Sequence, residues 1–279
     1  MARTNIFEKL QSRWDLEYEA NCLWRLIEEE PSFFYQKLYT MRDFVADYCF
    51  STWKNRGSFL KLYDFLDAVS YYDLIEEAAE NPEALLDFIE IAFNLYYMAE
   101  TYRKRMKPSL FKVYDAYHFF FKTANDCLAH YNHKVYYNEE SEQAIVIEDK
   151  PEVTAVAELE DPDSAYDIIR YNHHALKGNL TEKRAILLKM GNQLEPQRPQ
   201  LTACNKQLTS DAFCLLNNLN IRHNNCTPGD SKYKAVVAQM DDATLESWYD
   251  ELYQMILLAK LELEHTTRTA NVQALTAQF

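Results

Sequence analysis

The stretch that decides the fold is SDAFCLLNNLNIRHNNCTPGD, residues 210–230, together with the apolar pattern that continues from it to residue 264. Apolar side chains recur every three or four residues on both sides of a polar turn, and this spacing predicts two helices. The first stripe is Leu208, Ala212, Leu215, Leu216 and Leu219, and the second is Leu245, Trp248, Leu252, Ile256, Ala259 and Leu263. Thr227-Pro228-Gly229-Asp230 is typical of a turn, so we expect an antiparallel helical hairpin with Asp242 as the N-cap of its second helix.

Composition extends this helical prediction to most of the chain. The 279 residues include 48% hydrophobic and 14% aromatic residues but only four glycines, which favours helices over sheets or glycine-rich nucleotide loops. We therefore predict a mostly α protein with two helical-bundle parts joined around a short β-hairpin. The parts are residues 1–133, a hairpin and acidic connector at 134–160, and a C-terminal bundle at 161–279.

Several local patterns set the expected elements. Helices are predicted from Asn5 to about Glu30, over 32–54, over 59–79, from Pro82 to about residue 105 and over 110–131. Further helices are predicted over 161–175 and 181–194. Asn81-Pro82-Glu83 and Asp161-Pro162 resemble helix starts, with a cap and a proline in the first turn. Two β-prone runs around a polar turn, 135–137 and 144–147, predict the hairpin.

Charge and cysteines limit the functional classes. A formal net charge of −14 disfavours a general nucleic-acid binder, although the basic run 103–107 leaves a local contact open. The six cysteines form no CxxC pair, and most lie within helical apolar patterns, so we expect a cytoplasmic protein. No apolar run is long enough and free enough of charge to span a membrane, and no secretion signal is expected.

The polar turn holds the candidate catalytic residues, Arg222 and His223. An imidazole can move a proton near neutral pH, and a guanidinium can hold a phosphate or a developing oxyanion. The asparagines around the pair offer amide donors, and a second polar cluster ends the predicted 161–175 helix. The candidate binding residues are Asn217, Asn218, Asn224, Asn225, Arg170 and His174.

The alternative interpretation of the turn is structural. Adjacent helical residues point about 100° apart, so Arg222 and His223 converge only on irregular backbone or across a dimer interface. The asparagines would then cap helices, Arg222 would pair with a carboxylate and His223 would be exposed. The histidines show no metal-ligand spacing, so we expect neither a metal nor a cofactor.

The run 215–225, followed by Trp248-Tyr249 and a long closing helix, resembles the C-terminal part of uncharacterised bacterial helical proteins related to abortive-infection and HEPN-type proteins. The resemblance covers about residues 160–268. It implies a helical bundle that commonly dimerises, and a metal-independent ribonuclease in active members. The family separates its catalytic Arg and His by several residues, whereas Arg222 and His223 are adjacent, so a binding-only relative is equally compatible.

Two functions are therefore expected from the sequence. The first is an interaction module within an anti-phage defence assembly, in which the hairpin and an acidic surface contact a partner protein or a second copy. The second is a ribonuclease in which His223 deprotonates the ribose 2′-hydroxyl and Arg222 stabilises the phosphorane. In the second case RNA is the partner.

Overall fold

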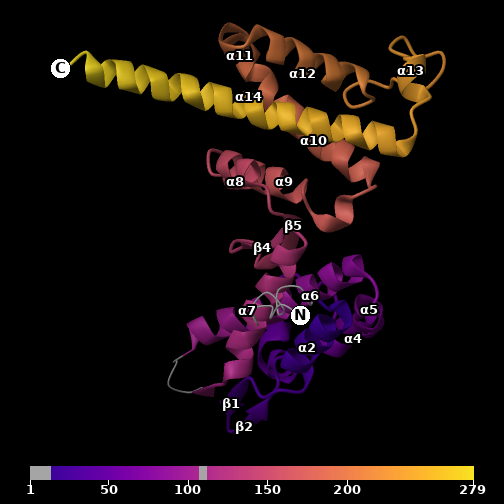
Figure 1. The fold of residues 1–279 in the computed structure, drawn as a ribbon, viewed down its shortest axis with the longest axis vertical. Helices are drawn as coiled ribbons and strands as arrows, with labels where there is room; N and C mark the ends of the chain where they lie inside the picture. The colour runs from indigo at the N-terminus through magenta and orange to yellow at the C-terminus, as the bar shows by residue number, and fades with distance from the viewer. Residues whose placement is uncertain (1–13, 107–111) are drawn as a thin grey trace, which may run out of the picture. The chain divides into compact units, whose positions relative to one another are not determined.

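The computed structural model describes residues 14–106 and 112–279, and its internal contacts divide the chain into units 1–149 and 150–279. Helices dominate the described part of both units, which confirms the mostly α prediction (Figure 1). The expected helical residues 5–13 and 110–111, and Lys107 of the basic run, lie outside the described residues. Within the described ranges, no helix has the length and apolar character needed to cross a bilayer.

The first unit packs helices around a small aromatic-rich sheet. A π-helical turn, Val45–Cys49, and a 3-10 turn, Phe50–Thr52, follow the short helix α3 (Met41–Phe44). The elements are α2 (Leu16–Glu28), β1 (Phe33–Tyr35), β2 (Lys37–Tyr39), α3 (Met41–Phe44), α4 (Leu62–Ala68), α5 (Tyr71–Ala78), α6 (Pro82–Arg105), β3 (Lys112–Val113), α7 (Asp115–His130), β4 (His133–Asn138) and β5 (Gln143–Glu148).

The predicted helix over 32–54 is wrong in its first part, where the chain forms two strands, whereas residues 41–52 form α-, π- and 3-10-helical turns. Strands β1 and β2 form a tight antiparallel pair through Gln36, whose φ of 65° is left-handed, and β3 pairs with the other edge of β1. Phe33 is fully buried while Phe34 is 44% exposed, so the aromatic run alternates between two faces as a strand does. The predicted 59–79 helix is likewise broken, because Ser70 adopts a φ of 52° between α4 and α5.

The hairpin β4–β5 belongs to the first unit. Asn94 of α6 donates to the Ala144 carbonyl at 2.9 Å and accepts from the Ala144 N–H at 3.0 Å. Glu90 accepts from the Val146 N–H at 2.7 Å. Helix α6 thus satisfies the exposed edge of β5, which explains how so short a hairpin is stable. This division differs from the expected separate connector at 134–160, because the second unit begins at Lys150.

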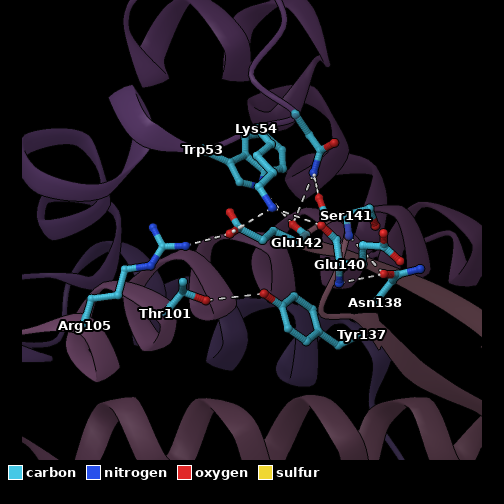
Figure 2. Close-up of polar contacts among 10 residues, drawn as sticks. Trp53, Lys54, Thr101, Arg105, Tyr137, Asn138, Glu140, Ser141 and Glu142 are labelled. Atoms are coloured by element: carbon cyan, nitrogen blue, oxygen red, sulfur yellow. Dashed lines mark hydrogen bonds and ion pairs between the residues drawn. The ribbon is translucent and has the colours of Figure 1, made fainter.

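The turn of the hairpin is held by side chains from two other segments (Figure 2). Glu142 forms an ion pair with Arg105 at 2.7 Å, and its backbone carbonyl accepts from the Trp53 indole at 3.0 Å. Lys54 donates to the Glu140 carbonyl at 3.0 Å. These contacts fix the left-handed Glu142, whose φ is 55°.

The second unit is a helical bundle built on α14 (Asp242–Thr276) (Figure 1). The expected 161–175 helix ends at Arg170, and a 3-10 turn, His174–Leu176, follows it. The N-cap of α14 is Asp241 rather than Asp242, since its carboxylate accepts from the Thr244 N–H at 2.7 Å. The other elements are α8 (Pro151–Ala157), α9 (Pro162–Arg170), α10 (Leu180–Leu194), α11 (Arg198–Cys204), α12 (Lys206–Asn218) and α13 (Ala235–Ala238), with a 3-10 turn, Glu195–Gln197, after α10.

Two features fix the core of this bundle. Gly191 lets α10 approach α12 closely, because a Cβ there would lie 2.6 Å from a terminal methyl of Leu216. The nearly buried Lys183 forms ion pairs with Glu246 at 2.7 Å and Asp250 at 2.8 Å, which joins α10 to α14. The predicted pairing of two long helices around the 217–225 turn is present as α12 and α14.

Candidate functional site

Arg222 of the predicted turn points into its own unit. Its guanidinium forms an ion pair with Glu195, donates to the Gly191 carbonyl at 2.7 Å and lies 5.3 Å from the centre of the Phe213 ring. The side chain is only 14% exposed. His223, by contrast, is exposed. Arg222 therefore matches the structural interpretation of the turn, in which it pairs with a neighbouring carboxylate.

Asn225 is the centre of the turn and is fully buried. Its side chain accepts from the Asn220 N–H at 2.8 Å and donates to the Lys232 carbonyl at 2.7 Å. The Asn225 N–H in turn donates to the Asn220 side chain at 3.1 Å. Asn220 itself adopts a left-handed φ of 56°. The Asn225 side chain thus provides the hydrogen bonds that a helix or sheet would otherwise give to these backbone groups.

The other candidate asparagines make local contacts or lie at the helix end. Asn218 donates to the Cys214 carbonyl at 2.8 Å, one turn back along α12, and Asn224 accepts from the Thr227 N–H at 3.1 Å. Asn217 is half-buried at the end of α12. Their contacts end the helix and order the following loop.

The second predicted cluster forms a separate set of contacts. Arg170 forms an ion pair with Glu182 of α10 at 2.8 Å, while Arg222 is paired with Glu195. His174 lies in the 3-10 turn, and its ring stacks on His173 with centroids 4.7 Å apart. The two predicted arginines are thus each engaged by a different carboxylate.

A cleft on the first unit, between α2 and the start of α7, is the site that the sequence did not predict. Its volume is about 620 Å³, which lies within the range of binding sites for drug-sized molecules or a few side chains. Most of the described lining side chains are apolar or aromatic. They are Tyr18, Asn21, Cys22, Arg25, Leu26, Glu30, Pro31, Tyr114, Asp115, Ala116 and Phe119.

Large apolar side chains stand open to solvent at this cleft. Tyr18 is 67% exposed and Phe119 is 57% exposed. The same helix α2 buries Leu23 and Ile27 completely in the core. Helix α2 therefore buries one face in the core and leaves Tyr18 at the surface, beside the partly exposed Cys22.

Among the described lining residues, the charged side chains are Glu30, Asp115 and Arg25. Lys112 lies beside the lining, with its Nζ 4.7 Å from the centre of the Tyr114 ring. Arg25 is the cation in the lining, and it is already paired with Glu29 at 3.4 Å and Glu30 at 3.0 Å. Burial, and then the negative charges of Asp126 and Asp15, raise the pKa of Glu19 on α2 above its usual 4.5. Glu19 does not line the cleft, and its raised pKa reflects burial first and the neighbouring carboxylates second.

The chemistry of the lining suits binding. Burial, and then the charge of Glu19, raise the pKa of the Cys22 thiol above its usual 9.0, so this cysteine is protonated and poorly nucleophilic at neutral pH. Cys22 is the sole thiol among the described lining residues. Asn21, Glu30 and Asp115 supply hydrogen-bonding groups at the edge of an apolar surface.

A smaller hollow lies beside the hairpin turn of Figure 2, between Trp53, Tyr102 and Tyr137. Its volume is about 20 Å³, which is room for about one water molecule. The ion pair of Arg105 with Glu142 occupies its polar side. This hollow is a packing feature of the hairpin, and the cleft between α2 and α7 is the larger site.

A partial signal for the cleft exists in the sequence. Tyr18 and Cys22 stand four residues apart and lead to the core residue Leu26, so the apolar pattern of α2 is wider than its fully buried face. The position of Phe119 next to them depends on how α7 returns to α2, which periodicity does not encode.

Comparisons with known proteins gave no match to any family model, to any curated protein or to any solved structure.

Proposed function

We propose that this chain is a protein-interaction module that binds a cationic, apolar-faced segment of a partner protein in the cleft between α2 and α7. The observation that carries the proposal is the open apolar lining, with Tyr18 and Phe119 both more than half exposed in a cleft of about 620 Å³. Exposed aromatic side chains grouped in a concave site are typical of binding surfaces.

The chemistry of the partner follows from the charges. The lining contains Glu30 and Asp115 against Arg25, and Glu17 and Glu19 lie in the first turn of α2. A partner segment with lysine or arginine beside its apolar side chains would complement this surface, whereas an acidic one would be repelled. The chain's net charge of −14 acts in the same direction at long range.

Membership of an anti-phage assembly, and a place in the cytoplasm, belong to the same proposal. The first rests on the resemblance of the C-terminal part to abortive-infection proteins. The second rests on six cysteines that the structure leaves as free thiols.

The ribonuclease alternative lacks a supporting arrangement at the turn, since Arg222 is engaged by Glu195 and Gly191 while His223 is exposed. Incubation with total tRNA tests it directly. Cleavage that is lost in both Arg222→Ala and His223→Ala, with both variants folded, would favour the enzyme over the module.

The interaction proposal is tested by titrating the full chain into a fluorescently labelled helical peptide made of lysine and leucine. We expect binding that weakens at high salt, and at least a tenfold loss of affinity in Tyr18→Ser and Phe119→Ser. Leu60→Ser is the matched control, because Leu60 is 79% exposed but does not line the cleft. Equal affinity in all three variants, or equal binding of a glutamate and leucine peptide, would refute the proposal.

A further inference from the structure

The last third of α14 extends beyond its own bundle (Figure 1). The last buried residue of the helix is Leu263, and every residue from His265 to Phe279 is exposed. Val272 is 59% exposed and Leu275 is 54% exposed. A helical segment of this length is only marginally stable in water without tertiary packing. The extension contacts its own bundle at its start, where Thr266 Oγ1 lies 3.1 Å from Cys204 Sγ.

The exposed residues of α14 continue a heptad pattern that starts on the packed part of the helix. Leu258, which is 48% exposed, lies on the side of α14 away from the core residues Ile256 and Ala259. The spacing alternates between three and four residues, which is the spacing of a coiled-coil seam. The seam consists of Leu258, Leu261, His265, Arg268, Val272 and Leu275.

We propose that this seam is a self-association surface, on which α14 of a second copy of this chain binds in the antiparallel direction. With the centre of the pair between residues 266 and 267, Leu258 meets Leu275 of the second copy and Leu261 meets its Val272. Each apolar residue of the extension then covers an apolar residue of the packed part that is not fully buried, since Leu258 is 48% exposed and Leu261 is half-buried. Because the residues of the seam pair symmetrically about one point of the helix, the partner that fits this surface is α14 of a second copy.

The polar residues of the seam select the antiparallel direction. In the antiparallel pair, His265 meets Arg268 of the second copy, so the two Arg268 guanidinium groups are not opposed. The pairing of Arg268 with Glu264 of its own helix, at 2.7 Å, is the same in either direction. In a parallel pair in the same register, Arg268 would face Arg268 and His265 would face His265. Like charges in opposed positions disfavour that arrangement.

This inference concerns a surface on the second unit and is independent of the proposed α2–α7 cleft. An isologous interface of this kind uses the same patch on both subunits, so one substitution removes two contacts from each dimer. The effect of a single change on the dissociation constant is correspondingly large.

The test is the molar mass of the full chain, measured by light scattering across a concentration series. We expect a concentration-dependent dimer, with the dissociation constant raised at least about 100-fold in Leu275→Asp and in Val272→Asp. Val236→Asp is the matched control, since Val236 is 67% exposed on α13 of the same unit. A monomer at all concentrations, or a dimer that Leu275→Asp leaves intact, overturns the proposal.

The direction is tested with cysteine variants. Under oxidising conditions, a mixture of Leu261→Cys and Val272→Cys protein should give a disulfide-linked dimer. Its amount should exceed that formed by the wild type, in which Cys204 and Cys214 are also exposed. Each variant alone should cross-link no more than wild type. Cross-linking of Val272→Cys with itself, in place of the mixed pair, would show a parallel dimer and overturn the antiparallel arrangement.

Discussion

Replacement of Arg222 by alanine should destabilise the second unit severely. The charged hydrogen bond to the Gly191 carbonyl contributes about 1.5–3 kcal/mol. The ion pair with Glu195 adds at most about 1 kcal/mol, because that carboxylate is 44% exposed. The contact with Phe213 adds about 0.5–1 kcal/mol. We expect a loss of roughly 3 kcal/mol, which for a unit of this size lowers Tm by about 10 °C.

Arg198→Ala is the matched control. Arg198 pairs with the same Glu195 at 3.4 Å and lies 4.4 Å from the centre of the same Phe213 ring, but its side chain is 48% exposed. Its loss should therefore lower the free energy of unfolding by about 1 kcal/mol, well below the roughly 3 kcal/mol expected for Arg222. The assay is thermal unfolding of the full chain by calorimetry, with the transition of the second unit followed in each variant. Equal Tm values for the Arg222 and Arg198 variants would refute the structural role of Arg222.

Acid gives a second readout of the same contact. Burial acts to raise the pKa of Glu195, but its hydrogen bond and charge interaction with Arg222 lower it below the usual 4.5. A carboxyl whose pKa is lower in the folded state adds stability above its unfolded pKa and loses it as the pH falls. The stability difference between wild type and Arg222→Ala should therefore stay nearly constant from pH 7 to about 5 and shrink as the pH falls below 4.5, through the lowered folded-state pKa. A difference that stays constant below pH 4.5 would contradict the pairing.

Three further substitutions test the same unit by thermal or chemical unfolding. Gly191→Ala should lower the free energy of unfolding by about 1 kcal/mol, because overpacking against the buried Leu216 exceeds the gain in helix propensity. This cost should shrink when Leu216 is also replaced by alanine. A single variant that is more stable than wild type would contradict the close packing. Asn225→Ala should cost about 2–4 kcal/mol and make the following loop sensitive to protease, since it leaves buried backbone groups unpaired; an unchanged digestion pattern would argue against that role. Lys183→Met should lower Tm at pH 7 but lower it less at pH 4. Burial acts to raise the pKa of Glu246, but the hydrogen bond and charge of Lys183 lower it below its usual value. Identical losses of Tm at both pH values would contradict the ion pair.

The helices with caps could be predicted from the sequence. Asn81 accepts from the Glu83 N–H at 2.9 Å, and Asp161 accepts from the Ser164 N–H at 3.2 Å, as the cap-and-proline patterns predict. The hairpin over 135–147 was also predicted, because turn and alternation are both local signals. These elements are specified by residues within a few positions of one another.

The parts that could not be predicted depend on distant segments. The aromatic run from Phe33 fits a helix or a strand by composition. Its pairing with β2 through the left-handed Gln36, and with β3 about 80 residues later, decides for the strand. Arg222 has no charged neighbour in sequence that reveals Glu195 as its partner. The cleft likewise requires Phe119 to lie beside α2, which depends on the packing of α7.

The most direct test of the interaction proposal is hydrogen exchange of the full chain, with and without a saturating lysine and leucine peptide. The proposal predicts slower exchange over residues 16–31 of α2 and the following turn, and over 114–119 at the start of α7. Protection confined to residues 210–230, or no change anywhere in the first unit, would contradict it.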